Sequence, residues 1–197
     1  MSAKAKVAAK GMKKVLEKKV LHGPLRTYIP AGKASGSPPL GTQLGCRGVN
    51  IPGFVKDFNE RTKNYKPGVP IPSIVEVKAD RSYKLTLQLP PFPYYLFQAA
   101  GINRGAMKAG WEVAGKITLK HLYEIALIKS QDIAYQASTL QEVVEVAMHS
   151  ARHCGIQVVR DLDPVEYGKF LEERVKIIQQ QRDELQAKRE AKLLRTG

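Results

Sequence analysis

Apolar residues recur with two different periods along this chain, and each period predicts a different kind of element. Residues 82–89 alternate between polar and apolar side chains, which is typical of a strand with one buried face. Residues 51–58 place apolar side chains at i, i+3, i+4 and i+7, the spacing that gives a helix one apolar stripe. Residues 140–151 follow the helical spacing again. The pattern therefore predicts strands in the first half of the chain and helices in the second.

Local signals add detail to the first half. Residues 25–31 favour a short strand, and Asn50 caps the helix that follows it, with proline in the first turn. A strand over residues 74–77 is joined to the strand at residues 82–89 through the turn Asp80-Arg-Ser82, which predicts a β-hairpin. We expect a small α/β domain in which the helix packs on this hairpin.

Capping residues divide the second half into helices. Residues 93–100 predict a short helix that ends at a C-cap glycine. Thr118 caps a second helix, and Ser138 or Thr139 caps a third. Residues 156–159 add a short strand that closes a compact three-helix domain. The fold class is therefore α+β.

Between the first two of these helices, residues 101–117 combine four glycines with three cations, Arg104, Lys108 and Lys116. A loop of this composition buries little surface, so we expect it to stay mobile until a partner orders it.

The tail, residues 163–194, is charged and favours a helix. A partial apolar seam is interrupted at Arg182, which argues against a sustained coiled coil and favours a solvated helix tethered to the body. The seam consists of Leu171, Val175, Ile178 and Leu185.

Composition shifts divide the chain into five segments. Two adjacent prolines form a semi-rigid, extended connection rather than a random linker. The segments are a basic N-terminal arm (1–25), a first domain (26–89), the diproline hinge (90–93), a second domain (94–161) and the charged helical tail (162–197).

The net charge of +14 is concentrated toward the N-terminus and the body of the chain. A basic arm on a basic body is the electrostatic footprint of a nucleic-acid-binding protein. An anionic membrane surface would also attract it, and a merely soluble basic protein is the plain alternative. The first 25 residues hold seven lysines and one acid, and they suit either a mitochondrial presequence or a retained RNA-contacting extension. The longest apolar run, residues 89–102, is too short to span a membrane.

The residue types argue against an enzyme. The chain has no phosphate-binding loop, no dinucleotide fingerprint and no paired carboxylates in an apolar setting, so we expect no catalytic residue and no cofactor. His149 and His153 have the spacing of two metal ligands, but Ser150 stands where a zinc protease needs glutamate. The two cysteines, Cys46 and Cys154, form neither a disulfide framework nor a zinc site.

A second use of these histidines is RNA contact. His149, Arg152 and His153 share one face of the predicted helix, and the glycine-rich loop would lie beside it. Cations flanking glycines, with the hydroxyls of Ser150 and Thr118 as neutral donors, suit contacts to phosphates and 2′-hydroxyls. An ordinary solvated helix face is the alternative. No aromatic-rich sheet face is predicted, so we expect recognition of a folded RNA shape.

Residues 32–51 are rich in glycine and proline and poor in charge, which presents backbone and small apolar surface to a partner. This segment and five others resemble the L-eleven family of large-subunit ribosomal proteins, and most closely its animal mitochondrial members. The six motifs are Ser37-Pro-Pro-Leu-Gly-Thr-Gln-Leu-Gly45, Gly48-Val-Asn-Ile51, Pro70-Ile-Pro72, Asp80-Arg-Ser82, Ala99-Ala-Gly101 and Ser150-Ala-Arg152 with Gly155.

The resemblance implies a structural constituent of the mitochondrial large ribosomal subunit, located in the matrix at the base of the ribosomal stalk. Its second domain would bind the GTPase-associated region of large-subunit rRNA. Its first domain would face translational GTPases, the stalk protein L-ten and other large-subunit proteins.

Carried over by position, the resemblance also implies two sets of site residues. His149 and His153 are added to the RNA-facing set because they share a helix face with Arg152. The RNA-facing set is Gly105, Lys108, Gly115, Lys116, Thr118, His149, Ser150, Arg152, His153 and Gly155. The partner-facing set is Pro38, Pro39, Gly41, Leu44 and Gly45. The rival interpretation is a protein–protein scaffold that acts through the tail and the proline-rich segment without binding RNA.

Overall fold

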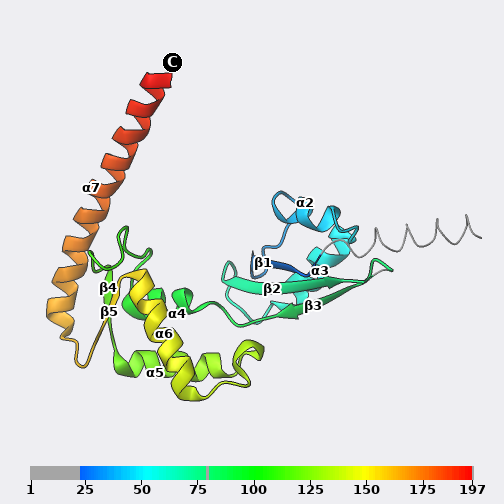
Figure 1. The fold of residues 1–197 in the computed structure, drawn as a ribbon, viewed down its shortest axis with the longest axis horizontal. Helices are drawn as coiled ribbons and strands as arrows, with labels where there is room; N and C mark the ends of the chain where they lie inside the picture. The colour runs from blue at the N-terminus through cyan, green and yellow to red at the C-terminus, as the bar shows by residue number, and fades with distance from the viewer. Residues whose placement is uncertain (1–22, 79, 197) are drawn as a thin grey trace, which may run out of the picture. The chain divides into compact units, whose positions relative to one another are not determined.

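The computed structural model describes residues 23–78 and 80–196 (Figure 1). Most of the predicted basic arm, residues 1–25, lies outside the described residues. The chain folds into two compact units. The first runs to Pro91 and includes Asp132–Ala134, and the second comprises Phe92–Gln131 and the residues from Tyr135 onward.

The first unit is built on an antiparallel sheet of order β1-β2-β3, formed by Leu25–Pro30, Pro70–Val77 and Tyr83–Leu87. The predicted hairpin is confirmed, with Val75 opposite Leu85 in the β2–β3 register. The turn between them holds Arg81 at a φ of 68°, and its Asp80 carboxylate accepts the backbone N–H of Ser82 at 3.0 Å.

Two helices accompany this sheet. The predicted helix is α3, Ile51–Arg61, and the Asn50 side chain caps it by accepting the Gly53 N–H at 3.5 Å. Phe54 of α3 packs edge-on against Tyr83 of β3, with ring centroids 5.3 Å apart. The short helix α2, Leu40–Gly45, follows the two prolines and has no side-chain cap, which is why the capping signals in the sequence did not predict it.

The second unit contains the three predicted helices: α4 (Phe92–Ala100), α5 (Leu119–Ser130) and α6 (Leu140–Cys154). The caps are as expected. Thr118 forms a capping box at the start of α5 and Thr139 forms another at the start of α6. A short 3-10 turn, Ile133–Tyr135, lies between α5 and α6. The helices enclose one apolar core, whose fully buried members include Leu96, Ile117, Leu122, Val143, Ala147 and Ala151.

One strand of this unit was missed. The predicted strand β5, Ile156–Val159, is confirmed, but it pairs in parallel with β4, Gly115–Thr118, in a stretch that the sequence assigned to a loop. Residues 101–114, called the loop 101–114 below, therefore connect α4 to a buried strand. The expectation that this region buries little is wrong at its ends, since Ile102 and Ala114 belong to the core.

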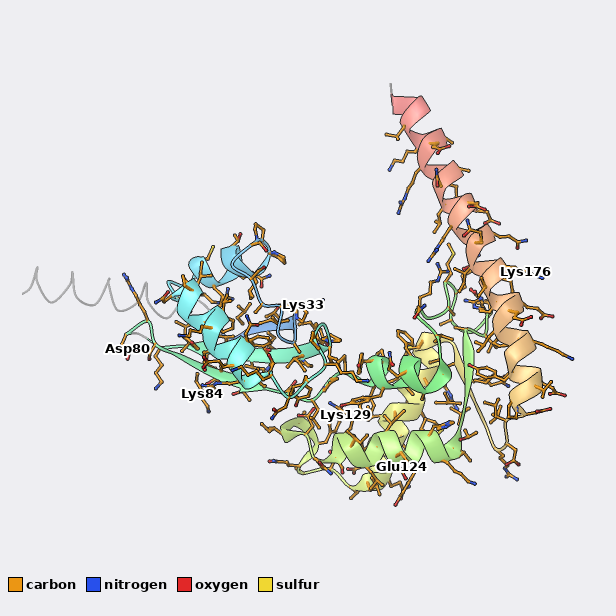
Figure 2. The ribbon with its side chains drawn as sticks, turned by 180° about the vertical axis from the view of Figure 1, so that it is seen from behind. Lys33, Asp80, Lys84, Glu124, Lys129 and Lys176 are labelled. Carbon is orange, nitrogen blue, oxygen red and sulfur yellow. The ribbon has the colours of Figure 1, made fainter. Side chains whose placement is uncertain are left out.

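The tail forms one helix, α7, over Pro164–Thr196 (Figure 1). Figure 2 shows charged side chains along its length, with Lys176 labelled. The predicted seam is partly wrong, because Val175 is 66% exposed whereas Arg174 is only 3% exposed. The first half of α7 thus belongs to the domain and is not a tethered, solvated helix.

Candidate nucleic-acid interface

Helix α6 presents the predicted basic face. Glu142 accepts the Thr139 N–H at 2.8 Å in the capping box, which fixes where the helix begins. With Val143, Ala147 and Ala151 turned into the core, the opposite face carries His149, Arg152 and His153, all of them exposed. Ser150 is half-buried, and its hydroxyl donates to the carbonyl of Val146 at 2.9 Å.

The loop 101–114 lies against the C-terminal end of α6, as predicted. The backbone N–H of Ala106 donates to the Cys154 carbonyl at 2.9 Å, and that of Ala114 donates to the Gly155 carbonyl at 2.8 Å. Arg152 shares a shallow hollow with residues 110–113 of the loop and with Gln157 of β5. Loop, helix end and strand therefore form one continuous surface, called the α6–loop face below.

Three glycines of the predicted RNA-facing set have roles inside the protein. Gly155 ends α6 at a φ of 73° and is buried, and a Cβ there would overlap that of Ala106. A Cβ on Gly105 would lie 2.8 Å from the Cys154 carbonyl oxygen, and one on the buried Gly115 would lie 3.2 Å from the Tyr167 hydroxyl. Close packing within the unit explains these glycines, so contact with RNA at them stays a prediction.

The remaining predicted RNA residues differ in availability. Lys108 is exposed on the loop 101–114. The Lys116 ammonium lies 5.3 Å from the ring centroid of Phe170, a cation–π contact that occupies it in part. Thr118 accepts the His121 N–H at 3.4 Å as the cap of α5. Among the predicted RNA-facing residues, Lys108, His149, Arg152 and His153 are thus the ones with exposed polar side chains on the α6–loop face.

Sequence reasoning missed Trp111. It is the only tryptophan of the chain, and it is 92% exposed at the tip of the loop 101–114, beside the hollow that Arg152 lines. A large aromatic ring in contact with water is a common sign of a binding surface. The surrounding loop has no apolar periodicity, so the sequence did not show whether this ring is buried or exposed.

Glu112 organises the loop from within. One carboxylate oxygen accepts the backbone N–H groups of Met107 and Lys108, at 3.1 and 3.4 Å. The other oxygen accepts the Gln181 amide at 2.8 Å and forms an ion pair with Arg174, both from α7. The Glu112 side chain is 17% exposed and that of Arg174 is 4% exposed.

The environment of Glu112 lowers its pKa. Burial alone would raise the pKa, but hydrogen bonds from Gln181 and Arg174, together with the charge of Arg174, outweigh burial and hold it below the ordinary value of 4.5. Burial alone raises the pKa of the Cys154 thiol, which keeps that thiol protonated at neutral pH.

A pH dependence follows from Glu112. Because its pKa is lower in the folded state, its contribution to stability is complete above the ordinary value and is lost as pH falls through the folded-state pKa. We expect the difference in unfolding free energy between wild type and Glu112→Gln to shrink as pH falls from about 6 to about 3. Urea unfolding of both proteins over this range measures it, and a difference that stays constant would contradict the assignment.

In the first unit, helix α3 holds the start of the proline-rich segment, residues 32–51, through hydrogen bonds to its backbone. The Asn59 side chain of α3 accepts the Ala34 N–H at 3.1 Å and donates to the Ala34 carbonyl at 3.3 Å. Of the predicted partner residues, Pro38, Pro39 and Gly45 are exposed. Leu44 is fully buried, so its prediction as a contact residue is corrected: its side chain anchors α2 in the core.

Gly41 is also buried. A Cβ at this position would overlap the carbonyl oxygen of Gly36, so the glycine allows the start of α2 to pack against the preceding loop. The accessible partner surface of this segment is therefore smaller than the sequence predicted.

The residues that the structure describes, 23–78 and 80–196, provide neither a metal cluster nor a membrane-spanning helix. They contain no group of three or more His, Cys, Asp or Glu side chains placed to hold a metal ion. Within the same residues, no helix combines the length and the apolar character needed to cross a bilayer.

Comparisons with known proteins cover both units. The family model described as "Ribosomal protein L11, N-terminal domain" matches residues 25–83, and "Ribosomal protein L11, RNA binding domain" matches residues 88–158. The second match contains the loop 101–114, α6 and β5 as far as Val158, and it stops before α7.

Individual relatives extend the match over the tail. "Large ribosomal subunit protein uL11m" of Drosophila melanogaster is 54% identical over 195 residues, which covers 99% of this chain and 100% of the relative. The protein of the same name from Caenorhabditis elegans is 46% identical and covers 96% of this chain and 100% of the relative. "Large ribosomal subunit protein uL11" of Ruegeria pomeroyi is 39% identical over 140 residues, which covers 71% of this chain and 98% of the relative.

Proposed function

The chain belongs to the ribosomal protein L11 family, a family of structural ribosomal proteins and not of enzymes, and from this premise we propose that it is a constituent of the mitochondrial large ribosomal subunit that binds rRNA through its second unit. The mitochondrial location is supported by the fly and worm relatives, which match over nearly the whole length and are mitochondrial members.

The observation that carries RNA binding is the α6–loop face itself. It lies within the match to the RNA binding domain and combines exposed cations with an exposed indole. Arg152 and Lys108 suit phosphate oxygens, His149 and His153 supply further donors, and Trp111 offers a ring on which an unpaired base can stack. Together these groups suit a folded RNA that has splayed-out bases.

We also propose finer partners. The second unit would bind the GTPase-associated region of the rRNA at the stalk base, and the first unit would face translational GTPases and the stalk protein L-ten. Support for the second part is the exposure of Pro38, Pro39 and Gly45 on a segment of defined backbone shape. Within the predicted hinge 90–93 between domains 26–89 and 94–161, Phe92 and Pro93 already lie in α4, so the adjacent Pro90 and Pro91 would serve as the hinge.

The test of RNA binding is Arg152→Ala in the full-length protein. If Arg152 neutralises a phosphate, the slope of log affinity against log salt falls in magnitude by about 0.7–0.9. Binding to a transcript of the stalk-base rRNA is measured by titration at several salt concentrations. Arg189→Ala is the matched control, since it removes the same charge from the exposed end of α7.

Two outcomes decide against this proposal. An unchanged slope in Arg152→Ala removes Arg152 from the interface. A full-length protein that associates with large subunits but does not bind the transcript, even at low salt, favours the rival function of a protein–protein scaffold.

A further inference from the structure

The loop 101–114 is held at three places by α7, a helix that lies outside both family-model matches. At the base of the loop, the Tyr167 hydroxyl donates to the Ala100 carbonyl at 2.5 Å and accepts the Lys116 N–H at 3.2 Å. Ala100 is the last residue before the loop, and Lys116 is the second residue after it. Tyr167 thereby joins both stems of the loop.

Further along, Arg104 of the loop donates to the side-chain oxygen of Gln181 in α7. The Gln181 amide in turn donates to Glu112 at 2.8 Å. One side chain of the helix therefore links an early and a late residue of the loop.

The third place is the carboxylate of Glu112. Its two oxygens act in different directions: one accepts backbone N–H groups of Met107 and Lys108, and the other is held by Arg174 and Gln181. Arg174 is 3% exposed, and a charged side chain is buried this deeply only when it is paired. The backbone beside Lys108 and Trp111 is thus tied to α7 through one residue.

We propose that α7 is an intramolecular brace that holds the loop 101–114 in its RNA-binding shape, with Glu112, Arg174 and Gln181 as positioning residues. This inference rests on the proposed RNA-binding function of the α6–loop face. It replaces the expectation from the sequence that an external partner must order a mobile loop. The entropic cost of ordering the loop is then offset by contacts with α7 during folding. RNA binding no longer has to offset this cost.

The brace predicts a particular combination of effects. A variant that loses it would spend part of its time with the loop disordered, and apparent RNA affinity falls in proportion to the ordered fraction. An ordered fraction of about one tenth would weaken binding about tenfold. The salt slope would stay unchanged, because the positioning residues do not neutralise phosphates themselves.

The experiment uses two variants of the full-length protein. Arg174→Met removes the ion pair and keeps an apolar stem in the same place, and Gln181→Ala removes a half-buried amide and leaves the core intact. Gln186→Ala is the matched control, since Gln186 is an exposed α7 glutamine whose amide donates to Glu190 of the same helix.

Loop order is measured first, without RNA. Hydrogen exchange of the Met107 and Lys108 amides reports the Glu112 contacts directly, and fluorescence anisotropy of Trp111, the only tryptophan, reports the loop tip. We expect exchange at least about tenfold faster in Arg174→Met, a smaller change in Gln181→Ala and none in Gln186→Ala. Unchanged exchange and anisotropy in both test variants would overturn the brace.

Binding to the stalk-base transcript is measured second. Weaker affinity with the wild-type salt slope supports the brace, and a slope reduced by about 0.7–0.9 in Arg174→Met would overturn it, because Arg174 would then be a phosphate contact. If the wild-type protein does not bind the transcript, the proposed function fails and the RNA half of this inference fails with it. Hydrogen exchange still decides in that case whether α7 braces the loop.

Discussion

Replacing Gly155 with alanine is expected to lower the free energy of unfolding of the second unit by about 2–4 kcal/mol, from left-handed backbone strain plus overpacking. Gly155 has a φ of 73°, where a side chain is strained in any surroundings. In addition, the new Cβ would overlap that of Ala106 and lie 3.0 Å from the Glu112 carbonyl oxygen. Neither atom is the end of a flexible side chain, so the loop 101–114 would have to move away from α6.

The matched control separates the two causes. Gly101 has a similar φ of 64°, but no atom lies within 4 Å of the position that its Cβ would take. Gly101→Ala should therefore show only the backbone cost, about 1–2 kcal/mol. Urea unfolding followed by far-ultraviolet circular dichroism measures both variants. Equal losses would mean that the loop does not press on Gly155.

The second large effect is expected at Trp111. If a base of the RNA stacks on this indole, Trp111→Ala weakens binding to the stalk-base transcript by about 1–3 kcal/mol, or roughly 5- to 150-fold. The salt slope should not change, because the indole carries no charge. Since the side chain is 92% exposed, stability should change by less than about 0.5 kcal/mol.

Two further substitutions at the same position identify the cause. Trp111→Phe keeps an aromatic face and should retain most of the affinity, whereas Trp111→Leu keeps apolar surface without a π-system and should resemble alanine. Affinity that follows apolar area alone, with leucine equal to phenylalanine, would point to a hydrophobic contact in place of stacking. Full wild-type affinity in Trp111→Ala would remove the indole from the interface.

Local sequence signals predicted most of the elements correctly, because their causes lie within a few residues. The alternation at residues 82–89, the apolar stripe at residues 51–58 and the caps Thr118 and Thr139 each depend on neighbours one to four positions away. The ordered motifs identified the family for the same reason, and the family models confirm it. The proximity of the loop to the end of α6 was also anticipated.

Residues whose role depends on distant partners were predicted poorly. Strand β4 was missed because Gly115 pairs with Ile156, which is far away in the sequence and in parallel orientation. Leu44 was assigned to the partner surface by its position in the family motif, and a motif does not show which of its apolar side chains are buried. Trp111 was not singled out, since neither burial nor exposure is visible in a loop without periodicity.

The sequence by itself determined most of the elements, the basic character and the family of this protein, because all three depend on composition and short-range pattern. Only the tertiary structure decided that the charged tail is part of the second unit. The apolar pattern of the tail did not show this contact with the second unit, because the deeply buried residue of α7 is the charged Arg174. A buried guanidinium needs a partner that compensates its charge, and here that partner is Glu112, 62 positions away in the chain.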